Sequence, residues 1–254
     1  MIPTEPGIPP AAGRRRLLLV GDSFGIERSH RGIIDVPEVQ TWPALAQAAL
    51  PSFEVVADFA AFRRLVDVPA ILDRLGSADL TVIQAGIVDC FPRPLPVSIS
   101  RSNRFIARLI RRGLVRPIYL LWMLFVHTTT GATSSEIDRA FGYFEALSEE
   151  RPITFITVPP PIPRHSAMTP GAHDAVLKFN DRLRQLSQRR PSVQLIDLYV
   201  EVVSRGYLDY LSPYDGHLNP DGNRLLANSV VATVIGTPNR RGPSRPTLGN
   251  EGEP

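Results

Sequence analysis

Five short apolar runs alternate with amphipathic stretches along this sequence, and that alternation limits the folds open to the chain. The runs have the length and composition of strands that are buried on both faces of a parallel sheet. They are residues 17–20, 53–56, 80–84, 153–158 and 193–198. Amphipathic stretches that suit helices lie between and after them, at residues 42–50, 69–75, 100–112, 134–147, 172–188 and 220–234. Strands and helices in this alternation predict a doubly wound α/β sheet with right-handed crossovers.

The length and composition predict one domain. A chain of 254 residues with 43% hydrophobic content can bury one sizeable core, and chains of this length are routinely single domains. Residues 1–13 and 236–254 are rich in proline, glycine and polar side chains, so we expect both ends to be disordered. The predicted domain spans residues 14–235.

The positive charge of the chain comes from arginine and is spread among acidic residues. The net charge is +3, Lys178 is the only lysine, and no basic stripe with interleaved aromatic residues stands out. We therefore expect no nucleic-acid partner. The single cysteine, Cys90, cannot form an internal disulfide and is expected to be a small buried residue. The first residues, MIPTEPGIPPAAGRRR, carry prolines where a secretory signal needs an apolar core, so we expect a cytoplasmic protein.

The first apolar run leads into the sequence GDSFG, which places Ser23 just beyond a predicted strand. In open α/β sheets, ligands bind beyond the carboxyl ends of the strands. A serine at such an exit can hold its hydroxyl in the open, with backbone N–H groups nearby, as a catalytic nucleophile does. The alternative is that Asp22 and Ser23 only cap a helix. This short motif alone leaves both interpretations open.

A serine nucleophile needs a base, and His217 is the best candidate among the five histidines. It stands in the sequence DGHLNPDG, where Asp215 precedes it by two residues and Pro220 opens an amphipathic stretch. A carboxylate two positions away in a turn can reach the imidazole and fix its tautomer, which leaves the other nitrogen for the serine. The alternative is a plain helix entry with a solvated aspartate.

Four motifs, in this order, resemble those of the SGNH hydrolases, the GDSL esterase and lipase superfamily. They are GDS after the first run, then TWPALAQAAL, VIQAGIVDC and DGHLNPDG, and the resemblance spans residues 17–234. It implies a flavodoxin-like, three-layer α/β/α sandwich around a mostly parallel five-stranded sheet. It also implies hydrolysis or transfer of an acyl ester through a covalent acyl-enzyme, without a metal or cofactor. Ser23 matches the family's nucleophile, His217 its general base and Asp215 the acid that orients the base, and the Ser23 backbone N–H matches one oxyanion donor.

Two positions depart from the family pattern, which marks the chain as a divergent member. The family's third motif carries an asparagine whose amide donates to the oxyanion, whereas this chain has Gly86 followed by Val88 in the asparagine position. Valine cannot donate, and losing one such donor costs about 10²–10³ in turnover. A glycine is also expected after the second strand, where the sequence offers Ala60, whose backbone N–H remains a candidate donor.

Arg93 follows the third motif on a segment braced by Pro92 and Pro94. Its guanidinium is a charged, forked donor that can replace the missing amide or hold an anionic part of the substrate. The alternative is an arginine that pairs with Asp89 or points to water, and the sequence leaves both open.

Residues 117–126 form an apolar run that is too short to span a bilayer as a helix. It fits either a lid or acyl-pocket wall that touches a membrane surface, or a segment packed into the core, and the second is favoured. We expect a short acyl group on a carbohydrate or similar carrier. Two alternatives stay open: an O-acyltransferase with the same triad, and a catalytically impaired binding protein that holds a glycan or a protein partner.

Overall fold

The computed structural model describes residues 13–30, 33–91, 133–169 and 171–237. Most of the two predicted disordered ends, the predicted helix at 100–112, the apolar run at 117–126 and Arg93 lie outside the described residues. Within the described ranges, no helix combines the length and the apolar character needed to cross a membrane.

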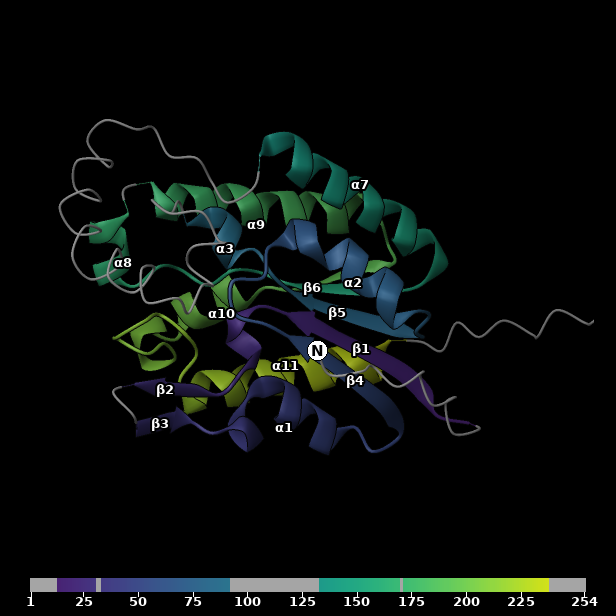
Figure 1. Cartoon of the computed structure of the whole chain (residues 1–254), viewed down its shortest axis with the longest axis horizontal. Coiled ribbons are helices and arrows are strands. Elements are labelled where there is room, and N and C mark those ends of the chain that lie inside the picture. Colours follow the sequence, from purple (N-terminus) through teal and green to yellow (C-terminus); the bar gives the residue numbers. More distant parts are fainter. Residues whose placement is uncertain (1–12, 31–32, 92–132, 170, 238–254) are drawn as a thin grey trace, which may run out of the picture.

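Five parallel strands form the central sheet (Figure 1). Their order across the sheet is β4-β1-β5-β6-β7, which is the flavodoxin-like order. The strands are β1 (Arg15–Gly21), β4 (Phe53–Phe59), β5 (Leu80–Gln84), β6 (Ile153–Ile156) and β7 (Val193–Ile196). Each contains or overlaps one of the five predicted runs, so the doubly wound α/β prediction is confirmed.

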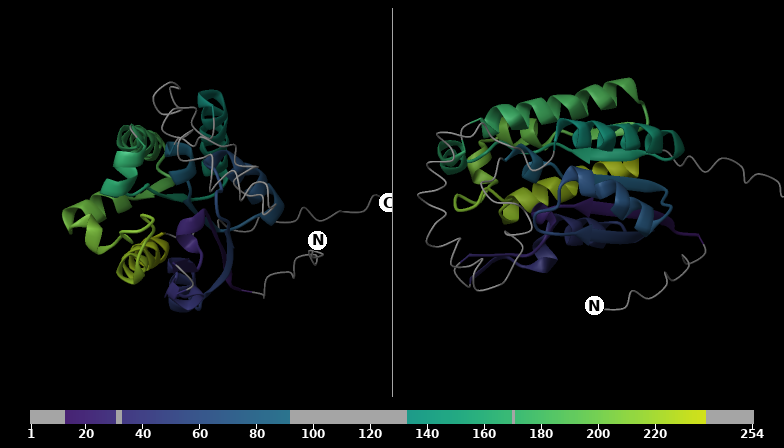
Figure 2. Two further views of the ribbon diagram at one scale, coloured as in Figure 1. Left: turned by 60° about the vertical axis from the view of Figure 1, so that its left-hand side comes forward. Right: turned by 45° about the horizontal axis from the view of Figure 1, so that its top comes forward.

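Helices cover both faces of the sheet and make it the middle of three layers (Figures 1 and 2). One outer layer holds α1 (Trp42–Ala49) and α11 (Pro220–Gly236). The other holds α2 (Val68–Leu75), α7 (Ser134–Glu150) and α9 (Ala172–Arg189). The predicted three-layer α/β/α sandwich is therefore confirmed.

Strand β1 contributes side chains to a hydrophobic core on each face of the sheet. Leu17 and Leu19 pack with the α1 and α11 side, whereas Leu18 and Val20 pack with the α2, α7 and α9 side. All four side chains are completely buried. Because successive side chains of a strand point to opposite faces, an unbroken apolar run serves two cores at once.

Several short elements were not predicted. They include the hairpin of β2 (Arg28–His30) and β3 (Ile33–Val36), the helices α3 (Ile87–Cys90), α8 (Pro163–Met168) and α10 (Leu198–Ser204), and the single-turn helices η1 (Ser23–Gly25) and η3 (Leu65–Asp67). Elements of this length span too few residues for a periodic apolar pattern.

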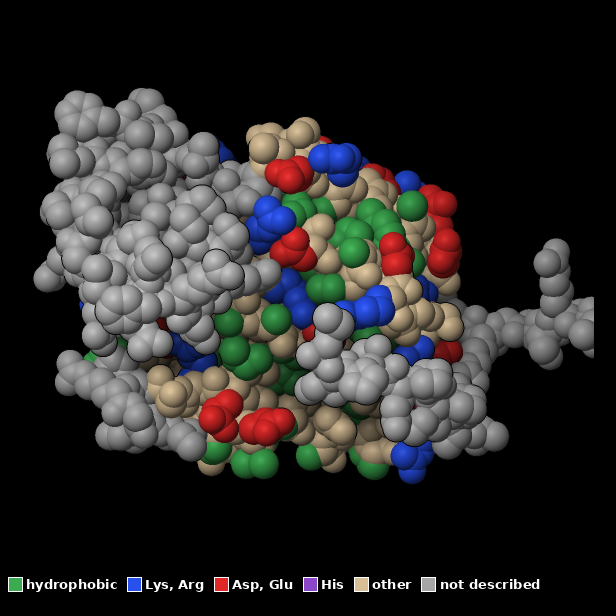
Figure 3. Space-filling model, viewed as in Figure 1, with side chains coloured by type: hydrophobic (Ala, Val, Ile, Leu, Met, Phe, Trp, Pro, Cys, Tyr) green, Lys and Arg blue, Asp and Glu red, His purple; other side chains and the backbone are tan. Residues whose placement is uncertain are grey.

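Charged side chains of both signs lie side by side on the outer surface of the α2 and α7 layer (Figure 3). Arg74 on α2 pairs with Asp58 at 2.5 Å, and Arg64 pairs with Asp67 at 3.0 Å. The interspersed charges of the sequence are therefore also interspersed on this face.

The two glycines of GDSFG leave room for one aromatic ring. A Cβ atom added at Gly21 or at Gly25 would overlap the side chain of Phe59, at the end of β4. The Phe59 ring in turn packs edge to face against Trp42 of α1, with 5.3 Å between the ring centroids. The turn that carries Ser23 is therefore pressed closely against β4 and α1.

Two carboxyl groups are buried close to this turn. Asp22 accepts a hydrogen bond from the Phe24 N–H at 3.0 Å, and Asp89 of α3 accepts one from the Leu65 N–H at 2.7 Å. Asp22 is fully buried and Asp89 is 3% exposed. Burial raises the pKa of Asp22 to about 7 and the pKa of Asp89 to about 6. Asp89 ties α3 to η3 through its bond to Leu65.

The buried carboxyl groups predict a loss of stability as the pH rises. Their pKa values are higher in the folded than in the unfolded chain, so the unfolded chain releases these protons first. Between about pH 4 and the folded pKa, each group lowers the free energy of unfolding by up to ~1.4 kcal/mol per pH unit. Asp89→Asn keeps an acceptor for the Leu65 N–H and removes one titrating carboxyl group. Its free energy of unfolding, measured in urea, should therefore fall less steeply between pH 4 and 6 than that of the unmodified protein.

Asp174→Asn is the matched control, because Asp174 is an exposed carboxylate in the first turn of α9. It should keep the slope of the unmodified protein. Equal slopes for Asp89→Asn and the unmodified protein would contradict this account.

The contact with Phe59 predicts that Gly25→Ala lowers the free energy of unfolding by about 1–3 kcal/mol through overpacking. Combined with Phe59→Leu, which removes the overlapping ring, the same change should cost less, as a double-mutant cycle measures. Gly142→Ala on α7 is the control: nothing lies within 4 Å of the added methyl group, so helix propensity should make it stabilising by up to about 1 kcal/mol. If Gly25→Ala and Gly142→Ala have the same effect, the close-packing explanation is wrong.

Candidate active site

Ser23 and His217 meet at the carboxyl end of β1 although 194 residues separate them. The Ser23 Oγ lies 2.8 Å from the His217 Nε2, which is a hydrogen-bond distance. Ser23 is largely buried in η1, and the ring of its neighbour Phe24 stacks on the imidazole with 5.0 Å between centroids. The stacked ring holds the imidazole plane beside the serine hydroxyl.

The loop that carries His217 is held by its own backbone. The Ser212 N–H donates to the His217 carbonyl at 2.7 Å, and the Gly216 N–H donates to the Ser212 carbonyl at 2.9 Å. Leu211 and Leu218 close the loop as an antiparallel bridge. These bonds fix the backbone of the loop that carries the imidazole.

The helix after the loop, α11, is docked on α1 by a buried asparagine. The Asn223 Oδ1 accepts from the Trp42 N–H at 2.8 Å, and its amide donates to the Leu218 carbonyl at 3.1 Å. Asn219 caps the helix by accepting from the Gly222 N–H at 2.9 Å. The histidine loop is therefore anchored to the layer that also packs against the serine turn.

Asp215 presents one carboxylate oxygen to His217. Its Oδ1 lies 3.3 Å from the His217 Nδ1 and accepts the His217 backbone N–H at 3.2 Å. The Nδ1 atom also lies 3.2 Å from the Asp215 carbonyl oxygen. Both neighbours of Nδ1 are acceptors, so they favour the tautomer with the proton on Nδ1. Nε2 is then left to accept the serine proton.

Asp215 is held as a carboxylate. Burial acts to raise the pKa of Asp215, but the hydrogen bond with His217 and the charge of Arg28 outweigh it, and the pKa lies well below its ordinary value. The Arg28 guanidinium bonds the second carboxylate oxygen, Oδ2. Sequence reasoning missed Arg28, because no local pattern links a residue of β2 to a loop 187 residues away.

Ala60 does not offer the donor that the sequence suggested. Its N–H donates to the Gly21 carbonyl at 3.2 Å and so continues the pairing of β4 with β1, which corrects that expectation. The buried Arg63 donates to the same carbonyl at 3.0 Å. A left-handed backbone, the conformation that favours glycine, occurs two residues later at Phe62, with φ +61°.

The third motif forms the start of α3. Gly86 precedes it with φ +127°, and a Cβ there would overlap the ring of Phe179 on α9. Val88 is buried. Cys90 is also buried, its thiol directed at the Ala175 carbonyl at 3.7 Å, and burial raises the pKa of this thiol well above its usual range. The prediction of a small buried cysteine is confirmed.

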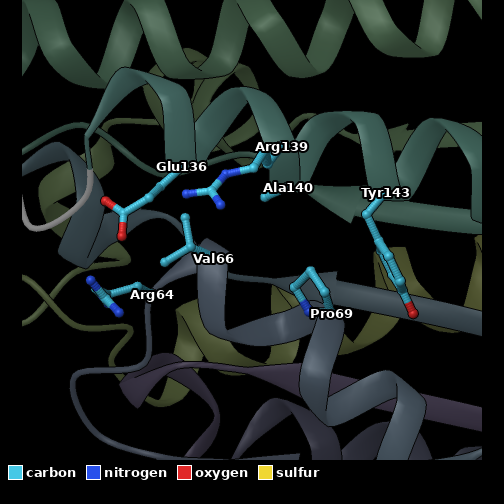
Figure 4. Close-up of a pocket in the computed structure, with 7 residues that line it drawn as sticks. All are labelled: Arg64, Val66, Pro69, Glu136, Arg139, Ala140 and Tyr143. Atoms are coloured by element: carbon cyan, nitrogen blue, oxygen red, sulfur yellow. The ribbon is translucent and has the colours of Figure 1, made fainter.

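One cavity of the described structure lies between η3, α2 and α7 (Figure 4). It has a volume of about 330 Å³, and the side chains of Arg64, Arg139 and Glu136 line one end while Tyr143 lines the other. Ser23, Asp215 and His217 do not line it. The candidate catalytic residues are therefore not part of this cavity.

Comparison with family models and with the sequences of curated proteins finds no match. Solved structures do match. A lipase/acylhydrolase from Enterococcus faecalis superimposes with a TM-score of 0.57 at 15% identity, over 87% of this chain and 96% of that chain. A carbohydrate acetylesterase family member from Sinorhizobium meliloti gives 0.55 at 17% identity, over 87% and 97%.

A catalytic mutant of an acetylxylan esterase from Geobacillus stearothermophilus gives a TM-score of 0.54 at 16% identity, over 90% of this chain and 97% of that chain. Other similar structures are described as lipolytic proteins of the G-D-S-L family. Identities this low establish the fold alone. The chain has the fold of the SGNH hydrolases, as the order of its motifs predicts.

Proposed function

We propose that this protein is a serine esterase that hydrolyses acyl esters through an acyl-enzyme. The observation that carries the proposal is the 2.8 Å contact between the Ser23 Oγ and the His217 Nε2, with Asp215 on the far side of the imidazole. A hydroxyl, a base and an orienting acid in this order are the parts that nucleophilic acyl transfer needs.

In the proposed mechanism, the Ser23 Oγ attacks the ester carbonyl carbon while the His217 Nε2 takes the hydroxyl proton. Asp215 stabilises the imidazolium that forms. The imidazolium then gives its proton to the leaving alcohol, and the C–O bond of the ester breaks to leave an acyl group on Ser23. Water attacks this acyl group with His217 again as base, and the acid leaves Ser23 with its hydroxyl restored.

The proposed oxyanion site is weaker than the family pattern. The backbone N–H of Ser23 is the first donor, Val88 supplies none, and Ala60 is bonded within the sheet. Arg93, which lies outside the described ranges, remains our candidate for the second donor because it follows α3 closely in the chain. Without a second donor, turnover should be about 10²–10³ below that of an enzyme with a complete oxyanion hole.

We further propose a short acyl group on a carbohydrate or similar carrier as substrate. Two of the similar structures come from acetylesterases that act on carbohydrates according to their names. An O-acyltransferase would use the same three residues with an alcohol in place of water.

Val88 stands where the family has its oxyanion asparagine, and this loss favours one rival function: a binding protein that keeps the fold and no longer turns over substrate. Against it stands the retained geometry of Ser23, His217 and Asp215, because a binding protein has no chemical need for all three together. Reaction with an active-site probe separates the two functions.

A fluorophosphonate probe should label the unmodified protein, because the probe reacts with an activated serine hydroxyl. Labelling should disappear in Ser23→Ala and fall at least about 100-fold in rate in His217→Gln. Ser204→Ala is the control, since Ser204 is exposed on α10 and bonds only the Glu201 carbonyl in the described structure. In-gel fluorescence measures labelling, and circular dichroism checks folding. A folded protein that takes no label would support the binding protein instead.

The second test compares acyl lengths. kcat/KM for p-nitrophenyl acetate should exceed that for p-nitrophenyl octanoate by at least about tenfold, because a site that serves short acyl groups discriminates against a chain six carbons longer. Rates measured with Ser23→Ala give the background to subtract. A preference for octanoate would refute the short-acyl proposal while leaving the esterase proposal intact.

A further inference from the structure

We propose that Arg28 is a positioning residue of the candidate triad, which holds the carboxylate of Asp215 by its second oxygen and balances the charge that faces His217. The inference builds on the proposed function. The residue stands outside the four motifs that carry the family resemblance, on a hairpin that the apolar pattern of the sequence did not predict.

The two oxygens of Asp215 have separate partners. Oδ1 lies 3.3 Å from the His217 Nδ1 and accepts the His217 backbone N–H at 3.2 Å, while Oδ2 accepts from the Arg28 Nη2. A carboxylate bonded at both oxygens cannot rotate about its χ2 angle without losing one partner. Arg28 therefore fixes the orientation in which Oδ1 faces the imidazole.

The hairpin aims Arg28 at this carboxylate. Arg28 pairs with Val36 across the strands, and the register shifts between Arg28 and Ser29. Such bulges re-aim a side chain relative to a regular strand. Val36 is buried, so the base of the hairpin is anchored in the protein.

The ion pair is partly shielded from water. The side chains of Arg28 and Asp215 are 26% and 34% exposed. Partial burial strengthens a charge pair relative to one on the open surface, where such pairs contribute little.

Four titratable or charged groups of the described structure contact the imidazole, or a residue that is bonded to it or next to it in the chain. They are Asp215 on its own loop, Arg28 from β2, Asp22 next to Ser23, and His165 of α8, which packs against Gly216. Arg28 is the permanent cation of this set. Without it, the negative charge of Asp215 acts on His217 unopposed and favours the imidazolium, while the freed carboxylate loses its fixed orientation.

The test is an NMR titration of the His217 imidazole in the intact protein, with the signal assigned by its loss in His217→Gln. In Arg28→Gln and Arg28→Met, the titration midpoint should move up by about 0.5 pH unit or more. Arg28→Lys keeps the charge and should leave the midpoint within about 0.3 unit. The hairpin forms its own two-stranded sheet, so these changes leave the five-stranded sheet intact.

Arg205→Gln is the matched control, because Arg205 also pairs with a carboxylate, Glu201 at 3.0 Å, on α10. It should leave the midpoint unchanged. A midpoint that stays constant in Arg28→Gln would overturn the proposal. A midpoint that moves down would overturn the charge-balancing part of the proposal and support the positioning part, because a displaced Asp215 supports the imidazolium less.

Catalysis gives the second readout. kcat of Arg28→Gln should fall roughly tenfold, and the acid limb of its pH–kcat profile should move to higher pH. Arg28→Lys should recover part of the rate. An unchanged kcat in Arg28→Gln would overturn the positioning role. If the unmodified protein reacts with neither ester nor probe, the proposed function fails, and the NMR titration still decides the role of Arg28.

Discussion

The hydrogen bond between Ser23 and His217 depends on almost every larger feature of the fold. It requires β1 to end where the loop before α11 arrives, and α11 to dock on α1 through Asn223. It also requires the serine turn to stay pressed against Phe59, which only glycine at positions 21 and 25 permits. A hydroxyl and an imidazole from opposite ends of the chain are thus brought within 2.8 Å by packing that is distributed over two layers.

The electrostatics of the site follow from unequal burial. Asp22, one residue before the serine, is fully buried, and its pKa rises to about 7 because burial outweighs the hydrogen bonds that it accepts. Asp215 is half-buried beside Arg28 and His217, and these partners hold its pKa well below the ordinary range. Two aspartates near one serine therefore have different tasks: one supports the turn, and the other stays charged opposite the imidazole.

Much of this was predictable from the sequence, and the reasons are physical. The runs around Leu18, Val82 and Phe155 are apolar at consecutive positions because each strand is covered on both faces, so strands and layers could be predicted. Ser23 and His217 could be predicted because each stands in a local motif beside a strand end or helix start. The structure brings them together as the order of motifs suggested.

The supporting contacts could not be predicted. Arg28 bonds a residue 187 positions away, and no local pattern encodes that pairing. Ala60 follows β4 as expected, but its N–H continues the pairing with β1, and the left-handed position falls on Phe62 instead. The residue at which a strand ends and the residue that turns left-handed can each shift by one or two positions without a clear change in the apolar pattern. The apolar pattern therefore could not predict them.

The most direct test of the central claim is a crystal structure of the protein after reaction with a small organophosphonate ester. The account predicts phosphorus bonded to the Ser23 Oγ, with the His217 Nε2 within hydrogen-bond distance of the adduct. Phosphorus on another side chain, or an unmodified Ser23 that lies more than about 5 Å from the imidazole, would contradict it.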